Sequence, residues 1–305
     1  MQNYDVAIIG GGPAGLTAGL YASRYGLNTV LIERGMYGGQ IVNAGHVENY
    51  PGFPQGISGM DLGQMFYEQS TRFGLSTITS EVTAFKHTGK TFLISTDDDE
   101  IEAKAVVIAS GSYYRKLGVP GEDNLTGRGV SYCATCDGFL FKNKDVAVIG
   151  GGDTAVSDAL ELSQNCSKVY VVHRRHELRA TQALQKVAFS IPKIEFVWDS
   201  VIWKIEGEDK VAKLTVKSTK NGDLSDLVVE GVFVAIGFIP NNTLFKDLVD
   251  LDEAGNIVTD DLMRTKVPGL FAAGDIRRNS ARQVATAVGD GATAGKTAFA
   301  YIKEG

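Results

Sequence analysis

Cysteine, basic tracts and long apolar runs are all scarce in this 305-residue sequence. Its three cysteines are too few for the disulfide framework of a small secreted protein. A net charge of −6, with no basic tract beyond Arg174-Arg175, argues against nucleic acid as a partner. No apolar run reaches the roughly 18 residues that a membrane helix needs. We therefore expect neither a nucleic-acid partner nor a membrane anchor.

The start of the sequence also lacks the basic and apolar regions of a secretory leader, because Met1–Asp5 runs straight into an apolar segment. We expect a cytoplasmic protein, and in that compartment a cysteine pair is more often catalytic than structural. Glycine, in contrast, is abundant: 36 of the 305 residues are glycine, well above the usual share of roughly 7%. This abundance is typical of a chain with several tight phosphate-binding turns.

The first of these turns opens the chain. An apolar run at residues 4–9 predicts a strand, residues 16–25 predict a helix, and a second strand at residues 28–32 ends at Glu33. Between the first strand and the helix stand Gly10, Gly12 and Gly15, in the G-x-G-x-x-G positions of a dinucleotide-binding turn. Glu33 is well placed to accept hydrogen bonds from ribose hydroxyls. A glycine-rich turn without a ligand is the less favoured alternative.

A second turn of the same kind follows in the middle of the chain. A strand at residues 145–149 leads into Gly150, Gly152 and Ala155, then a helix at 156–163 and a strand at 168–172. The second strand ends not at an acid but in cations: His173, Arg174 and Arg175, with Arg179 four residues on. Cations pair with a 2′-phosphate, so we expect this site to prefer NADPH over NADH. A solvated surface cluster is the alternative for these arginines.

Two thiols lie between the two turns. Cys133 and Cys136 are three residues apart and are followed at once by Asp137. Such a pair can cycle between dithiol and disulfide when a reductant supplies electrons, and an adjacent carboxyl can shuttle the proton. A purely structural disulfide, or a zinc set completed by His173 and His176, would leave both glycine turns unexplained. We expect no metal.

The remaining segments suggest how the modules are joined. The end of the chain has an apolar strand running into Gly274-Asp275 and a helix at residues 283–302, but no βαβ unit of its own. It therefore completes the first module, and the middle module is an insertion. We expect domains at residues 1–113, 114–240 and 241–305, the first and third forming one module. Other predicted strands are at residues 77–97, 101–108, 194–198, 201–206, 211–217 and 227–236.

The whole chain resembles the low-molecular-weight bacterial and archaeal thioredoxin reductases. The most specific match is Cys133-Ala134-Thr135-Cys136-Asp137-Gly138, lying just before the second glycine turn. The resemblance implies an α/β fold of two Rossmann-like modules of the three-layer ββα type, with the NADPH module inserted into the FAD module. It also implies a homodimer, FAD and NADPH as cofactors, and thioredoxin as the protein substrate.

The same resemblance implies residue roles. Cys136 would lie nearest the flavin, Cys133 would attack thioredoxin, and Asp137 would be the acid–base group; Arg128 and Phe139 would belong to the thioredoxin-docking surface. FAD would be bound by Gly10, Gly12, Pro13, Ala14, Gly15, Glu33, Arg34, Gly38, Gly39, Gln40, Asn49, Gly111, Gly274, Asp275, Arg282, Gln283 and Val284. NADPH would be bound by Gly150, Gly152, Asp153, Thr154, Ala155, His173, Arg174, Arg175 and Arg179. Asp153 departs from the Asn of many relatives, and its charge is expected to weaken cofactor binding modestly.

Three other functions share parts of this pattern. A ferredoxin–NADP-type flavoprotein oxidoreductase would use both turns but needs no dithiol, so the Cys pair argues against it. A flavin disulfide reductase with another protein client or electron donor would keep every motif. A protein that binds FAD without turnover would need only the first glycine turn.

Overall fold

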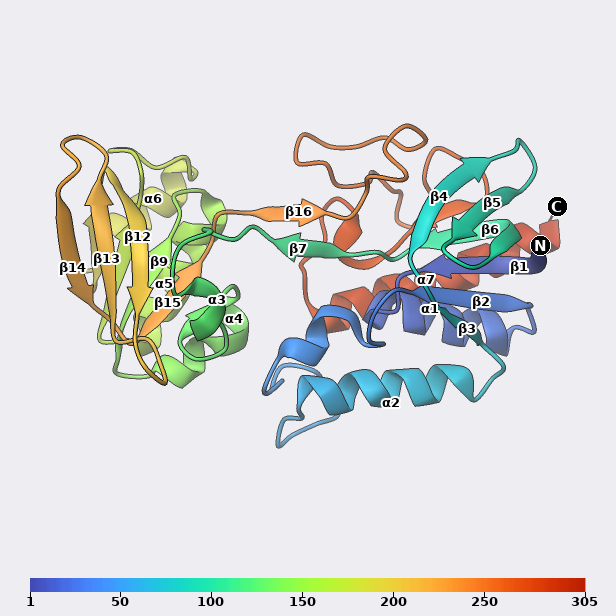
Figure 1. Ribbon diagram of the computed structural model, residues 1–305, viewed down its shortest axis with the longest axis horizontal. Coiled ribbons are helices and arrows are strands. Elements are labelled where there is room, and N and C mark those ends of the chain that lie inside the picture. Colours follow the sequence, from blue (N-terminus) through green and yellow to red (C-terminus); the bar gives the residue numbers. More distant parts are fainter. Residues whose placement is uncertain (305) are drawn as a thin grey trace. The chain divides into compact units, whose positions relative to one another are not determined.

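The computed structural model describes residues 1–304 and divides into two compact units. Unit 1 consists of Met1–Tyr113 and the described part of Ile239–Gly305, and unit 2 of Tyr114–Phe238. Unit 2 thus interrupts unit 1 in the sequence, as the colours of Figure 1 show. Two chain crossings join the units, and the strands there, β7 (Ser112–Tyr114) and β16 (Phe238–Pro240), pair as a two-stranded ribbon. The expected α/β class, with one module inserted into another, is confirmed.

Unit 1 is built on a seven-stranded sheet of order β3-β2-β1-β6-β5-β4, with β17 also paired to β6. The strands β3, β2, β1, β6 and β17 run parallel, whereas β4 and β5 are antiparallel additions. Their bounds are β1 Gln2–Ile9, β2 Thr29–Glu33, β3 Ser76–Thr79, β4 Val82–His87, β5 Phe92–Thr96, β6 Glu100–Ile108 and β17 Leu270–Ala272.

The central parallel strands of unit 1 are apolar where both faces of the sheet are buried, as at residues 6–9 of β1 and 105–108 of β6. Val6 and Ile8 of β1 point to one face, where they pack with helices α1 (Pro13–Arg24) and α7 (Val284–Glu304). The alternate residues of β1 point to the other face, which strands β4 and β5 and the segment around Phe245 cover. Unit 1 therefore has three layers. A further helix, α2 (Gly59–Thr71), follows the irregular stretch that includes the 3-10 turn η1 (Gly39–Asn43).

Unit 2 repeats the layered plan on a smaller scale. Its five-stranded parallel sheet has the order β11-β10-β9-β15-β8. Helices α5 (Asp153–Asn165) and α6 (Gln182–Phe189) pack on one face, and a three-stranded antiparallel sheet packs on the other. The strands are β8 Val130–Ser131, β9 Asp145–Ile149, β10 Lys168–Val172, β11 Ile194–Val197, β12 Ser200–Glu206, β13 Lys213–Ser218, β14 Leu224–Val228 and β15 Gly231–Val234.

Unit 2 also has three short helical elements. They are α3 (Glu122–Leu125), α4 (Ala134–Asp137), which begins directly after Cys133, and the 3-10 turn η2 (Gly138–Phe141). In unit 1, a third 3-10 turn, η3 (Gly274–Ile276), follows β17. Within residues 1–304, no helix has both the length and the apolar character needed to cross a membrane.

Three sequence expectations about elements were wrong. Residues 227–236 form two strands, β14 and β15, that belong to different sheets. Valines lie on both sides of the break at Val229-Glu230, so the apolar pattern alone did not reveal it. Residues 77–97 contain parts of three strands rather than one. Helix α1 begins at Pro13 rather than Leu16, because proline suits the first helical position, where no amide partner is lost.

Candidate redox and nucleotide sites

Cys133 and Cys136 form a disulfide, with their Cα atoms 5.3 Å apart. Cys133 lies two residues after β8 and is the N-cap residue of the short helix α4, so the disulfide spans the first turn of this helix. The backbone amide of Cys136 donates to Sγ of Cys133 at 3.2 Å. An amide donor of this kind stabilises a thiolate, so Cys133 is the better placed of the two sulfurs to act as the nucleophile once the bond is reduced.

Asp137 ends the same helix and is partly buried beside Ser131. Its Oδ2 lies 2.6 Å from the hydroxyl of Ser131, which is 6% exposed. Burial raises the pKa of Asp137, and the hydrogen bond from Ser131 opposes that rise. Ser131 is a contact that the sequence reasoning missed, because a serine at the end of a two-residue strand carries no motif.

Helix α5 brings two more acids to the cysteine-bearing segment. Glu161 accepts a hydrogen bond from the hydroxyl of Thr135, between the two cysteines, at 2.9 Å. Asp158 lies one turn earlier on α5, and burial together with the charge of Glu161 raises the pKa of Asp158 to about 7. The sequence reasoning missed both acids, although an Asp and a Glu three residues apart share one face of a helix.

The first glycine turn has the geometry of an anion cradle. Gly10 has a φ of 110°, which favours glycine, and Gly12 is the N-cap residue of α1. Gly12 has no side chain to cap the helix, so the amides at the start of α1 are left open to a ligand. A Cβ on Gly15 would overlap the carbonyl oxygen of Gly10, so only glycine lets the helix pack this closely. These residues fit the pyrophosphate of a dinucleotide.

Glu33 at the end of β2 accepts two backbone hydrogen bonds. The amide of Gly11 donates to one carboxylate oxygen at 2.7 Å, and the amide of Gly35 donates to the other at 2.8 Å. The carboxylate therefore fixes the turn, and each oxygen keeps a lone pair for a ribose hydroxyl. Arg34 is exposed and forms an ion pair with Glu81 at 3.2 Å.

The loop after Glu33 folds back onto the first turn. The amide of Gly38 donates to the carbonyl of Gly11 at 2.8 Å, and both Gly38 and Gly39 have positive φ. The side chain of Gln40 reaches the carbonyl of Ser112, next to Gly111. These contacts bring the predicted adenosine-side residues to the glycine turn.

The C-terminal part of unit 1 reaches the same edge of the sheet. In the parallel register, Ile9 of β1 and Ala272 of β17 both pair with Ile108 of β6. The residues that follow these strands, among them Gly10, Gly111 and Gly274, therefore meet at the carboxyl edge, where open α/β sheets bind ligands.

Asp275 follows Gly274 in η3 and is mostly buried. It accepts a hydrogen bond from Ser280 at 3.0 Å, and burial raises its pKa. Farther along, Asn49 donates to the side chain of Gln283 at 3.0 Å, which ties two distant predicted FAD-site residues together. Arg282 lies beside Gln283 with a φ of 53°, and Val284 begins α7.

An ion pair inside unit 1 holds η3 against α7. Asp290 of α7 is 6% exposed and accepts from Arg277 at 2.5 and 2.7 Å through its two oxygens. It also accepts from the amide of Gly274 at 3.1 Å. The sequence reasoning missed this pair, yet a signal was present, since Asp290 is the one acid within a long stretch of small and apolar residues in α7.

The second glycine turn, in unit 2, repeats the first. Gly152 is the N-cap residue of α5, and a Cβ on Gly150 would crowd the side chain of Ala155. Asp153 is the first residue of α5, followed by the exposed Thr154. One carboxylate oxygen of Asp153 accepts from the amide of Thr181 at 2.7 Å. This carboxylate thus anchors the loop that carries the predicted phosphate-binding arginines.

The arginines of that loop are available to a ligand. Arg174, Arg175 and Arg179 are exposed, and within residues 1–304 their side chains form no ion pair. The amide of Arg179 donates to the carbonyl of Gly151 at 2.7 Å, which keeps the loop against the glycine turn. His173 is instead 5% exposed and packs under Gly151. Burial lowers the pKa of His173, and the arginine charges lower it further, so this side chain is neutral.

The redox pair and the second glycine turn share one edge of the sheet of unit 2. β8, β9, β10 and β15 are parallel, so their carboxyl ends lie together. The cysteine segment follows β8, the glycine turn follows β9, and the arginine loop follows β10. Unit 2 therefore presents a reducible disulfide and a dinucleotide cradle along the same edge.

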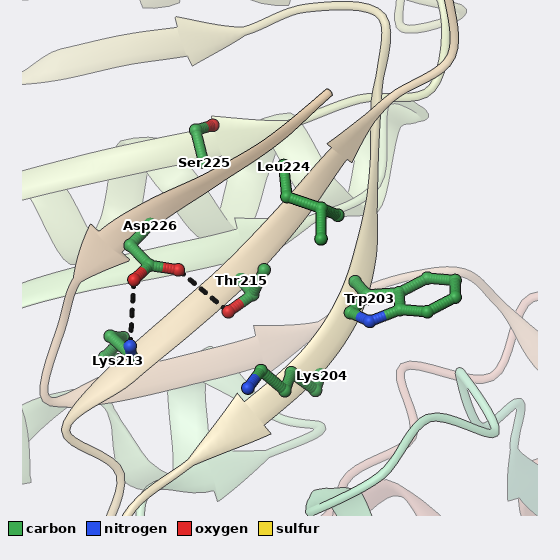
Figure 2. A pocket seen from close by; sticks show the side chains of 7 residues that line it. All are labelled: Trp203, Lys204, Lys213, Thr215, Leu224, Ser225 and Asp226. Atoms are coloured by element: carbon green, nitrogen blue, oxygen red, sulfur yellow. Dashed lines mark hydrogen bonds and ion pairs between the residues drawn. The ribbon is translucent and has the colours of Figure 1, made fainter. Parts of the chain in front are cut away.

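Two other features lie apart from these residues. Among residues 1–304, no group of three or more His, Cys, Asp or Glu side chains is arranged to hold a metal ion. A hollow of about 450 Å³ lies on the antiparallel sheet of unit 2 (Figure 2) and contains none of the predicted site residues. Asp226 accepts from both Lys213 and Thr215, each at 2.8 Å, as the dashed lines of Figure 2 mark, so these three polar side chains of the hollow bond one another.

The two residues expected in the docking surface differ in their surroundings. Phe139 is 40% exposed and is followed by Leu140, which is 54% exposed. Two neighbouring apolar side chains are thus exposed to water directly after the redox segment. The guanidinium of Arg128 donates to the carbonyl of Asn124.

Comparisons with known proteins agree over the full length. A family model for pyridine nucleotide-disulphide oxidoreductases matches residues 4–291. The chain is 46% identical over 303 residues to a thioredoxin reductase of Listeria innocua, with 99% of this chain and 94% of that protein covered. A thioredoxin reductase of Bacillus subtilis is 45% identical over 302 residues, with 99% and 95% covered. The crystal structure of thioredoxin reductase from Streptococcus pyogenes has a TM-score of 0.93 at 47% identity, covering 99% of both chains.

Proposed function

Because this chain belongs to the pyridine nucleotide-disulphide oxidoreductases and, within them, to the thioredoxin reductases, we propose that it uses NADPH, FAD and the Cys133–Cys136 pair to reduce the disulfide of a thioredoxin. The observation that carries the proposal is the shared edge of unit 2, where a reducible disulfide lies beside a glycine cradle and free arginines. The ferredoxin–NADP-type alternative is not favoured, because its chemistry has no use for the disulfide.

FAD is assigned to unit 1. The open amides at the start of α1 would hold its pyrophosphate, Glu33 its adenosine ribose and Asp275 its ribityl hydroxyls. The support is the meeting of these residues at one sheet edge, together with a buried carboxylate in η3 whose burial raises its pKa. When bound, FAD supplies a ring that takes a hydride and gives two electrons to a disulfide.

NADPH is assigned to unit 2. The amides at the start of α5 would hold its pyrophosphate, and Arg174 and Arg179 would hold its 2′-phosphate. Arg175 lies in the same loop, and His173 supports the loop from beneath. Exposed guanidiniums without carboxylate partners are suited to phosphate, because no existing ion pair has to be broken.

The reduced pair would then pass its electrons on by thiol–disulfide exchange. Cys133, as a thiolate, attacks the client disulfide and forms a mixed disulfide, and Cys136 resolves it by attacking Cys133. Asp137 takes up and returns the proton that these steps release and require. The exposed Phe139 supports a protein client rather than a small molecule. We further infer a cytoplasmic homodimer without a metal.

The test is an NADPH-dependent thioredoxin-reduction assay on purified yellow protein, with Cys136→Ser and Cys133→Ser as variants. Wild type is expected to reduce thioredoxin, and both variants are expected to lose turnover while their flavin is still bleached by NADPH. A colourless protein that takes up no flavin would contradict the proposal. Wild-type activity retained in Cys136→Ser would do so as well.

A further inference from the structure

Ser131 joins the redox pair to Asp137 through its buried hydroxyl. Its Oγ accepts from the amide of Cys133 at 3.1 Å and lies 2.6 Å from Oδ2 of Asp137. We propose that Ser131 is a positioning residue for proton transfer, which holds the Asp137 carboxyl beside the cysteine pair in both of its protonation states. The proposal rests on the function proposed above, which gives Asp137 its acid–base role.

The hydrogen-bond inventory of Ser131 explains why one hydroxyl serves both states. When Asp137 is ionised, the Ser131 hydroxyl donates to the carboxylate. When Asp137 is protonated, its O–H donates to the same Oγ, and the serine proton turns to the carbonyl of Cys133, 3.3 Å away. Every donor then keeps an acceptor in either state. An alanine at this position would leave the carboxylate and the Cys133 amide without these partners.

The surroundings make this hydroxyl the main polar influence on Asp137. Burial raises the pKa of Asp137, and only the Ser131 hydrogen bond acts in the other direction. Helix α4 packs against α5 and η2. The charged residues of α5 are Asp153, Asp158 and Glu161, all acids, and Glu161 accepts from Thr135 of α4. The turn η2 contains no titratable side chain. Within residues 1–304, no cation contributes to the pKa shift of Asp137.

The proton step is balanced over one exchange. The enzyme dithiol gives two electrons to the client disulfide, so one enzyme S–S bond forms and one client S–S bond breaks. The exchange has two attacks, Cys133 on the client disulfide and Cys136 on the mixed disulfide. In each, Asp137 accepts the proton of the attacking enzyme thiol and donates a proton to the client thiolate that leaves, so the two enzyme thiol protons end on the two client thiols. The net proton change of Asp137 is zero, so its carboxyl must gain and lose a proton without leaving its position. The hydrogen bond with Ser131 holds the carboxyl in that position.

The first experiment measures the Asp137 carboxyl directly, without turnover. Infrared difference spectra of the oxidised holoenzyme are recorded as a function of pH, with Asp137→Asn subtracted as the baseline. Ser131→Ala is expected to raise the pKa of Asp137 by about one pH unit or more, because the carboxylate loses its donor. An unchanged pKa would overturn the proposal, whatever the enzyme's client proves to be.

A second pair of variants separates the hydroxyl from its volume. Ser131→Thr and Ser131→Val differ only in a hydroxyl and a methyl group, so both disturb packing alike. Threonine is expected to keep the wild-type pH profile of thioredoxin reduction, and valine to move its Asp137-dependent limb to higher pH. Equal profiles for the two variants would contradict the proposal. If wild type reduces no thioredoxin, the proposed function fails, but the infrared result still decides the role of Ser131.

Discussion

Arg277 and Asp290 form a two-bond ion pair that also holds the amide of Gly274. The carboxylate is almost fully buried and accepts from Arg277 at 2.5 and 2.7 Å and from Gly274 at 3.1 Å. The charge of Asp290 also raises the pKa of Asp275, after the larger effect of burial. Asp290 therefore opposes ionisation of the residue proposed to hold the ribityl chain, whereas the charge of Arg282 favours it.

Breaking this pair is expected to destabilise unit 1. Arg277→Met leaves Asp290 charged and buried without its partner, which costs about 3–5 kcal/mol. We expect a lower free energy of unfolding in urea. Flavin is also expected to be released at a lower urea concentration, which the rise in flavin fluorescence measures. Combining Arg277→Met with Asp290→Asn removes both charges and is expected to recover part of the loss. Additive losses in the double variant would show that the two side chains act independently.

The arginine loop predicts nucleotide preference. Arg174→Ala and Arg179→Ala are each expected to raise KM for NADPH roughly tenfold or more, because a charge-assisted bond to phosphate is lost. KM for NADH, which lacks the 2′-phosphate, is expected to change little. Steady-state assays with both nucleotides measure the ratio, and Lys186→Ala, an exposed cation on α6, is the control. A ratio unchanged in Arg174→Ala would refute this interpretation of the loop.

Asp153 allows charge and anchoring to be separated. Asp153→Asn keeps an oxygen that can accept from the amide of Thr181 and removes one negative charge from the start of α5. We expect it to bind NADPH slightly more tightly. Asp153→Ala loses the anchor as well and is expected to bind NADPH several-fold more weakly, since the arginine loop is freed. Calorimetric titration with NADPH, which needs no flavin signal, compares the two variants. Tighter binding by the alanine variant than by wild type would rule out an anchoring role.

Asp158 predicts a pH dependence of stability. Its pKa is raised to about 7 in the folded protein, against roughly 3.9 in an unfolded chain. Between these values the folded state keeps a proton that the unfolded state has released, so stability falls as pH rises towards 7. Asp158→Asn has no carboxyl to ionise and so avoids this loss of stability. Its free energy of unfolding is expected to exceed that of wild type by about 1–2 kcal/mol at pH 8 and by less at pH 5, with partial exposure of the side chain taken into account.

Urea unfolding at the two pH values measures that difference. Glu161→Gln is the matched control, because it keeps an acceptor for Thr135 and removes the charge that helps to raise the pKa of Asp158. It is expected to reduce the pH dependence without abolishing it. A gap between wild type and Asp158→Asn that is the same at pH 5 and pH 8 would contradict the assignment.

The sequence could predict the motifs whose residues lie close together in the chain. The Gly10 and Gly150 turns and the Cys133–Cys136 pair each lie within a few residues, so spacing alone indicates their chemistry. The inserted module could be inferred because the last segment has no strand–helix–strand unit of its own. Contacts between distant residues gave no such signal. Arg277 reaches Asp290 only after η3 and α7 pack, and Ser131 reaches Asp137 only once α4 has formed.

The missed strand boundary has a related cause. Apolar residues continue from Leu227 across the break to Val234, and the two strands belong to sheets that face the same core. Periodicity therefore carried no mark of the change from one sheet to the other. Similarly, the sequence indicated that Asp153 carries a charge near a pyrophosphate, but the contact with Thr181 depends on a loop 28 residues away.

The third cysteine has a practical consequence. Cys166 is fully buried at the C-terminal end of α5, and burial raises its pKa to about 11, so at neutral pH it is a shielded, protonated thiol. Alkylating reagents applied to the intact protein should therefore add mass only at the other two sulfurs. Mass spectrometry of one alkylated sample would then give the fraction of the protein in which the Cys133–Cys136 pair is reduced.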